Sequence, residues 1–199
     1  STLELKRTPF HERTSRLSVA QNWRRWAGYR VVGSYDLSLD HEYWAIRDRA
    51  ALIDVSPLMK YVVEGPDAAR LLHRVTTRDI VKMQTGQVYY TGWCDEDGKL
   101  IDDGTVSRLG ERHFRVTSAE PSFRWLGMNA VGMDVKITEL TDHVAALSLQ
   151  GPKSRAVLNR VCRDKLDQLK YFRWMNTSVG NVPVSVSRTG YTGDLGYEI

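Results

Sequence analysis

The stretch QVYYTGWCDEDGKLIDDGTVS, residues Gln87–Ser107, decides how this chain folds. Its first half is rich in Val, Tyr, Thr and Trp, which favour strands, and its second half begins apolar and then alternates. Between the halves lies Asp95–Gly98, where Gly98 can adopt the positive φ that closes a tight turn. The pattern predicts an antiparallel β-hairpin.

The register of this hairpin brings an acidic and a phenolic side chain together. If the loop is DEDG, Cys94 pairs with Lys99. Counting back along the ladder then places Tyr90 directly opposite Asp103, while Asp102 points to the other face because successive side chains alternate. A carboxylate beside a phenol on a rigid sheet can support proton or charge chemistry. From the residues alone, a surface Asp beside a packing Tyr is the favoured interpretation.

The composition excludes several classes of protein. Hydrophobic residues make up 42% and charged residues 26% of the 199, which is ordinary for a globular protein of one large domain or two small ones. No apolar run approaches the roughly 18 residues of a membrane span. The net charge of +4 is dispersed, and no motif that reads nucleic acid accompanies it. We therefore expect neither a membrane nor a nucleic-acid partner.

The sequence also lacks the patterns of metal and hydrolase sites. The five His residues are scattered, and none has metal-ligand spacing to another His or Cys, so no metal site is expected. No GxSxG nucleophile motif is present. Cys94 and Cys162 are far apart and predict free thiols, as in a cytoplasmic protein.

The order of elements between residues 59 and 140 indicates the fold class. It reads strand, helix, hairpin, strand, helix, strand. This order predicts an α+β fold in which helices pack on antiparallel sheets. The last residues predict a strand that the chain end interrupts, so we expect the chain to be a piece of a longer protein.

A second candidate site lies in SRTGYTGDLGYE, residues 187–198. Gly190, Gly193 and Gly196 recur at three-residue intervals and can let the backbone approach a ligand closely. Tyr191 and Glu198 would supply its aromatic and polar groups. The alternative is a plain glycine loop, and the motif is not a phosphate-loop or dinucleotide signature.

These residues carry a family pattern. The chain resembles the aminomethyltransferase family, which comprises the T-protein of the glycine cleavage system and its folate-dependent relatives. The resemblance runs in the family's order from about residue 40 to the end. It rests on DVS (54–56), EGPDAARLL, TTRDI (76–80), GQVYYT, DEDGKLIDDGTV, LQGPKSRAVL and SRTGYTGDLGYEI.

The resemblance also implies a domain organisation. Residues 1–58 and 140–199 form one discontinuous and truncated domain, and residues 59–139 form a ferredoxin-like α+β domain. Proteins of the family continue well past this point, so the chain corresponds to their N-terminal portion.

The family binds tetrahydrofolate in a central cavity and moves one-carbon units onto it. By resemblance, Asp103 is the catalytic carboxylate and Tyr90 lines the same cavity. Thr117 stands in a stretch that flanks the cavity and is expected to contact the cofactor. Tyr191 resembles a ring-contacting tyrosine, and Glu198 resembles a glutamate that accepts hydrogen bonds from the pterin N–H groups.

Four departures from the family pattern bear on the donor of the one-carbon unit. Pro57-Leu58 stands where glycine-cleavage members have His-Met, Gly104 where an aliphatic residue is usual, Ser107 where Tyr is common, and residues 117–119 replace Asn-Ala-Ala. These changes weaken the case for a lipoyl carrier protein as donor. They fit a small methylated N, O or S compound.

Three functions follow from the resemblance. The first is a tetrahydrofolate-dependent one-carbon transferase resembling aminomethyltransferase, whose donor is a small molecule or a lipoyl carrier protein. The second is a folate-dependent demethylase of a small methylated compound. The third is a folate-binding assembly or regulatory protein without turnover.

Overall fold

The computed structural model describes residues 4–199, which divide into two compact units. We call Leu58–Val144 the inserted unit. We call the residues up to Pro57 together with Ala145–Ile199 the flanking unit. Each unit is built around antiparallel sheet, so the predicted α+β fold class is confirmed.

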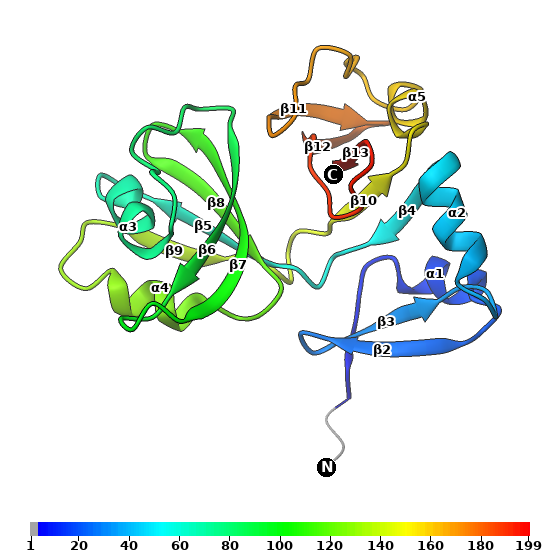
Figure 1. Ribbon diagram of the computed structural model, residues 1–199, viewed down its shortest axis with the longest axis horizontal. Helices are drawn as coiled ribbons and strands as arrows, with labels where there is room; N and C mark the ends of the chain where they lie inside the picture. Colours follow the sequence, from blue (N-terminus) through cyan, green and yellow to red (C-terminus); the bar gives the residue numbers. More distant parts are fainter. Residues whose placement is uncertain (1–3) are drawn as a thin grey trace. The chain divides into compact units, whose positions relative to one another are not determined.

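The inserted unit is a five-stranded antiparallel sheet with two helices (Figure 1, cyan-green to yellow-green). The strand order across the sheet is β6-β7-β8-β5-β9. The predicted sequence of elements is confirmed. The elements are β5 (Met59–Glu64), α3 (Ala68–Val75), β6 (Val88–Cys94), β7 (Leu100–Gly110), β8 (His113–Ser118), α4 (Phe123–Asn129) and β9 (Lys136–Glu139).

One face of this sheet forms the core of the inserted unit. Alternate residues of β5, such as Tyr61 and Val63, are completely buried there, together with Leu71 of α3. The Tyr61 ring also lies 6.2 Å from that of Phe123 in α4, which places α4 against the same face. Because side chains alternate along a strand, the opposite face carries the other residues of each strand, and most of these are polar.

The flanking unit contains a second five-stranded antiparallel sheet, of order β11-β12-β13-β10-β4. Its elements are β4 (Ala51–Asp54), β10 (Leu147–Gln150), α5 (Ser154–Asn159), β11 (Trp174–Val179), β12 (Val182–Ser187) and β13 (Gly196–Glu198). Its core is a cluster of buried apolar side chains: Leu149, Leu158, Cys162, Leu166, Leu169, Val186 and Tyr197.

The beginning of the flanking unit forms a smaller three-stranded sheet, of order β1-β3-β2, with two short helices (Figure 1, blue). Its elements are β1 (Lys6–Arg7), α1 (His11–Leu17), β2 (Asn22–Trp26), β3 (Tyr29–Ser34) and α2 (Asp40–Asp48). Strands β2 and β3 form a hairpin whose turn contains Gly28 at φ +83°.

Candidate functional site

The β6–β7 hairpin forms, but its turn is one residue shorter than the sequence suggests. The Asp95 amide donates to the Lys99 carbonyl at 2.9 Å, so the loop is residues 96–98. Gly98 has φ +77°, the conformation expected of it. Cys94 consequently pairs with Leu100, and the predicted pairing of Cys94 with Lys99 is wrong.

A β-bulge adds a second shift. Trp93 pairs with Asp102 while the next residue of β6 pairs with Leu100, so Ile101 has no partner in the ladder. The predicted direct opposition of Tyr90 and Asp103 is therefore wrong, because Tyr90 faces Thr105 and Asp103 faces Gly92.

The contact itself is nevertheless made. Two one-residue shifts restore the same face, since side chains repeat every two residues. Tyr90 and Asp103 are therefore diagonal neighbours on one face, within reach of a long aromatic side chain. The Tyr90 hydroxyl donates to Oδ2 of Asp103. The predicted meeting of the phenol and the carboxylate is confirmed.

The two neighbouring aspartates have different environments. Oδ1 of Asp102 accepts from the Asp103 amide at 2.8 Å, and its Oδ2 accepts from the Glu120 amide at 3.3 Å. Asp102 is thus committed to backbone hydrogen bonds. Within residues 4–199, Oδ1 of Asp103 has no hydrogen-bond partner. Of the two, Asp103 is the carboxylate with an oxygen to offer a ligand.

Thr117 lies on the same face as the Tyr90–Asp103 pair. Tyr90 pairs with Thr105, Thr105 pairs with Thr117, and Thr117 pairs with Lys60, so these four form one row across the sheet. The hydroxyls of Thr105 and Thr117 are hydrogen-bonded to each other. The sequence singled out Thr117 but missed Thr105, which orients its hydroxyl.

The strand that carries Tyr90 is an edge strand, and the segment after α3 holds it. The Thr77 amide donates to the Gly92 carbonyl at 3.0 Å, and Arg78 donates to the Tyr90 carbonyl at 3.1 Å. The Arg78 guanidinium also lies 4.0 Å from the centre of the Tyr89 ring. These contacts satisfy backbone groups that an edge strand would otherwise leave unpaired.

The hydrogen bond to Asp103 raises the pKa of Tyr90, and burial and the negative charges of Asp103 and Asp102 raise it further. The phenol therefore loses its proton at a higher pH than an ordinary tyrosine, whose pKa is 10.0. The stabilisation that this hydrogen bond contributes is present below that pH and is lost as the pH rises through the higher pKa of the folded state.

Asp103→Asn should return the pKa of Tyr90 toward its ordinary value of about 10, because the carboxylate that holds the phenol proton is gone. The pKa of Tyr90 is measured by following phenolate formation in the ultraviolet as the pH rises. Subtracting the titration of Tyr90→Phe isolates the signal of Tyr90 from those of the other tyrosines. Identical titration curves for wild type and Asp103→Asn would show that the carboxylate does not hold the proton.

Tyr191 and Glu198 both lie in the flanking unit. Glu198 is in β13, where it pairs with Ser148 of β10 and Ser187 of β12. Its neighbour Tyr197 is completely buried, so Glu198 lies on the face opposite to the core. Tyr191 lies in the loop that precedes β13 and is 71% exposed. The two residues predicted from the motif are thus an exposed aromatic residue, Tyr191, and a carboxylate on the non-core face of β13, Glu198.

The glycines of this motif have a role that the sequence did not suggest. A Cβ atom at Gly190 or Gly196 would lie 2.2 Å or 2.0 Å from Oε1 of Gln150. The two glycines thus make room for a buried side chain of this protein. That a ligand approaches the backbone here stays a prediction. Gly193 has φ +74° and serves the turn of the loop.

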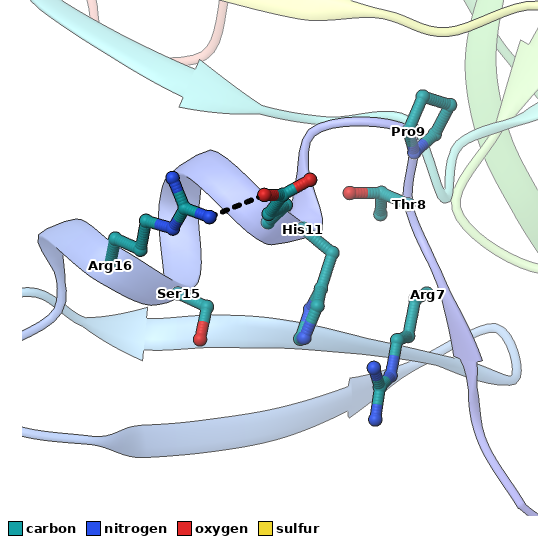
Figure 2. Close-up of a pocket in the computed structure, with 7 residues that line it drawn as sticks. Arg7, Thr8, Pro9, His11, Ser15 and Arg16 are labelled. Carbon is teal, nitrogen blue, oxygen red and sulfur yellow. Dashed lines mark hydrogen bonds and ion pairs between the residues drawn. The ribbon is translucent and has the colours of Figure 1, made fainter.

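One hollow of the surface is lined by none of the predicted site residues. It has a volume of about 540 Å³ and is lined by residues at the start of the flanking unit. Arg16 of α1, labelled in Figure 2, forms an ion pair with Glu12 at 2.5 Å, and both side chains are largely exposed. Thr8 is already bonded to Asp54 at 2.5 Å. The hollow is a solvated surface feature that none of the sequence motifs predicted.

Within residues 4–199, no group of three or more His, Cys, Asp or Glu side chains is arranged to hold a metal ion. In the same part of the chain, none of the helices has the length and apolar character needed to span a membrane.

A family model described as the GCVT N-terminal domain matches residues 10–199. The chain belongs to this family. The family resemblance expected from the motifs is thereby confirmed, and so is its restriction to the N-terminal portion of the relatives.

Two curated relatives illustrate how this GCVT domain compares with other members. It is 35% identical over 206 residues to the trimethylamine-oxide aldolase of Ruegeria pomeroyi. The aligned region covers 98% of this chain and 26% of that relative. The chain is 34% identical over 199 residues to the aminomethyltransferase of Halothermothrix orenii, in an alignment that covers 98% of this chain and 55% of that relative. The chain thus spans about half or less of the length of these relatives.

Solved structures agree with this assignment. The glycine cleavage system aminomethyltransferase T of Bartonella henselae superposes with a TM-score of 0.86 at 27% identity, over 98% of this GCVT domain and 53% of that chain. The heterotetrameric sarcosine oxidase of Corynebacterium sp. U-96 gives a TM-score of 0.58 at 19% identity, over 88% of this chain and 85% of that one. The second similarity concerns the fold alone.

Proposed function

We propose that this protein is a tetrahydrofolate-dependent one-carbon transferase in which Asp103 is the catalytic carboxylate. The observation that carries the proposal is the hydrogen bond from the Tyr90 hydroxyl to Asp103, on the polar face of the inserted sheet. Membership of the GCVT family and the similarity to aminomethyltransferases support it.

The residues of the inserted sheet fit an amine ligand. Oδ2 of Asp103 is fixed by Tyr90, and Oδ1 has no partner within residues 4–199, so it can accept from an N–H group. Tetrahydrofolate, when bound, supplies the nitrogens that receive the one-carbon unit. The carboxylate would orient such a nitrogen and offset the positive charge that develops during transfer, rather than act as a nucleophile.

Each of the other residues has a narrower role in this proposal. Tyr90 fixes the rotamer of Asp103 and, with its raised pKa, remains a hydrogen-bond donor throughout the physiological range. Thr117 offers a hydroxyl that Thr105 holds in place. Tyr191 would contact a ring of the ligand, and the carboxylate of Glu198 would accept from the pterin amino and ring N–H groups.

A titration of tetrahydrofolate into the full-length protein tests this function. We expect the wild type to bind, and Glu198→Ala to weaken binding by about tenfold or more, because charge-assisted hydrogen bonds are lost. Isothermal titration calorimetry measures the Kd of the wild type and of Glu198→Ala. The control is Glu139→Ala, which removes an exposed carboxylate from a strand of the inserted sheet and should leave that Kd unchanged. A wild type that ignores tetrahydrofolate would contradict the proposed function.

A second candidate is a folate-dependent enzyme that takes its one-carbon unit from a small methylated amine or amine oxide. It is favoured by the similarity to a trimethylamine-oxide aldolase, which is as high in identity as that to the aminomethyltransferases. Pro57-Leu58, in place of the family's His-Met, agrees with it. Product analysis separates the two candidates, because transfer from an aminomethylated carrier protein leaves the bare carrier and ammonia, whereas transfer from a methylated amine or amine oxide leaves the small amine with one methyl group fewer.

A further inference from the structure

The flanking unit contains a fully buried amide that no sequence motif assigned to a role. Gln150, at the end of β10, is 1% exposed. Its Nε2 donates to Oγ of Ser148 at 3.0 Å and to the carbonyl of Thr189 at 3.2 Å. Its Oε1 accepts from Oγ1 of Thr192 at 2.8 Å. Both ends of the amide are therefore used.

The surroundings of this amide are built to hold it. Gly190 and Gly196 flank the Gln150 side chain so closely that a methyl group on either would overlap the amide. Gly196 pairs directly with Gln150 across the β10–β13 ladder. A buried amide can move aside only by leaving hydrogen-bonding groups unsatisfied, which is costly in the interior.

Two of the three partners of Gln150 lie in the loop that carries Tyr191. The bonded carbonyl of Thr189 and the bonded hydroxyl of Thr192 stand on either side of Tyr191 in the sequence. The ion pair between Arg47 and Asp194 of this loop, at 3.1 Å, is partly exposed and therefore contributes little stability. Without the amide, a loop with two glycines, Gly190 and Gly193, would sample many conformations.

We propose that Gln150 is a positioning residue that sets the conformation of the 189–195 loop and thereby places Tyr191 for ligand binding. The proposal rests on the proposed function, since Tyr191 is there a contact to folate. Gln150 itself touches only protein groups. It acts through the loop and through Gly196, the first residue of the strand that bears Glu198.

The test compares Gln150→Leu with a matched control in the full-length protein. Leu has a similar volume but forms no hydrogen bond. We expect backbone amides of residues 190–195 to exchange with deuterium about tenfold faster or more, and the Kd for tetrahydrofolate to rise by about tenfold or more. The control is Val186→Ala, which creates a cavity in the core of the same sheet and should lower Tm while changing that Kd by less than about twofold.

Gly190→Ala is a second variant that should break the same hydrogen bonds, by a change in the loop instead of a change in Gln150. Its added methyl should displace the amide, so it should reproduce both effects of Gln150→Leu. The double variant should then be no worse than either single variant, because both remove the same hydrogen bonds.

Three results decide between this proposal and its alternatives. Loop exchange that is unchanged in Gln150→Leu overturns the positioning role. Faster exchange with an unchanged Kd also overturns it, because the loop would then not matter for binding. A wild type that does not bind tetrahydrofolate removes the proposed function and with it the role of Tyr191, while the exchange rates still show whether Gln150 holds the loop.

Discussion

Asp103→Asn in the full-length protein should lower turnover by about a hundredfold or more while tetrahydrofolate still binds. The amide has nearly the shape of the carboxylate and can still accept from Tyr90, but it carries no charge to offset a developing cation. Removing one preorganised electrostatic contact of this kind typically costs 10²–10³ in kcat. Turnover at saturating tetrahydrofolate, with the Kd measured in parallel, separates the chemical step from binding.

Asp102→Asn is the matched control, because it makes the same chemical change one residue away. Asp102 accepts hydrogen bonds from two backbone amides and lies on the other face of β7. Its replacement should change turnover by less than about threefold. An Asp103→Asn enzyme that binds folate and turns over at the wild-type rate would remove Asp103 from the mechanism.

Gly104→Val should destabilise the protein strongly, because strands β7 and β8 come very close together at Gly104. A Cβ atom there would lie 1.9 Å from the backbone carbonyl oxygen of Thr117 and 3.1 Å from the ring of Trp93. Because the closest atom belongs to the backbone, strands β7 and β8 would have to separate. We expect the free energy of unfolding to fall by about 1–3 kcal/mol, the usual cost of overpacking, measured by chemical denaturation.

Gly127→Ala is the control for this change. Gly127 lies in α4, and a Cβ atom there meets nothing within 4 Å. Because Ala favours helix over Gly, this variant should stabilise the protein by about 0.5–1 kcal/mol. A Gly104→Val protein as stable as wild type would show that β7 and β8 do not approach as closely as described.

The hairpin could be predicted from the sequence, but its register could not. Residue types and Gly98 indicate two strands and a turn. The register depends on Asp95, whose side chain accepts from the amides of Asp97 and Lys99 and whose backbone closes the loop. It depends as well on a bulge at Ile101 that no local pattern marks. The Tyr90–Asp103 contact was nevertheless predicted correctly. The two register errors, one at the turn and one at the bulge, add up to two residues, which is the period at which side chains return to the same face of a strand.

The flanking unit was harder to predict, for two physical reasons. Strand β11, Trp174–Val179, was not expected, because its stability comes from pairing along all of β12 rather than from a strong local pattern. The role of Gln150 was not predicted, because the loop residues that it bonds, Thr189 and Thr192, lie about 40 residues away in the sequence. The one local signal is a polar residue that ends the apolar strand LSLQ, just before Gly151.

The most direct test of the central claim is an experimental structure of the full-length protein with bound tetrahydrofolate. The account predicts a folate nitrogen within about 3.2 Å of the Asp103 carboxylate, whose other oxygen still accepts from the Tyr90 hydroxyl. Bound folate that leaves Asp103 without a contact to the ligand, or Tyr90 turned away from Asp103, would contradict it.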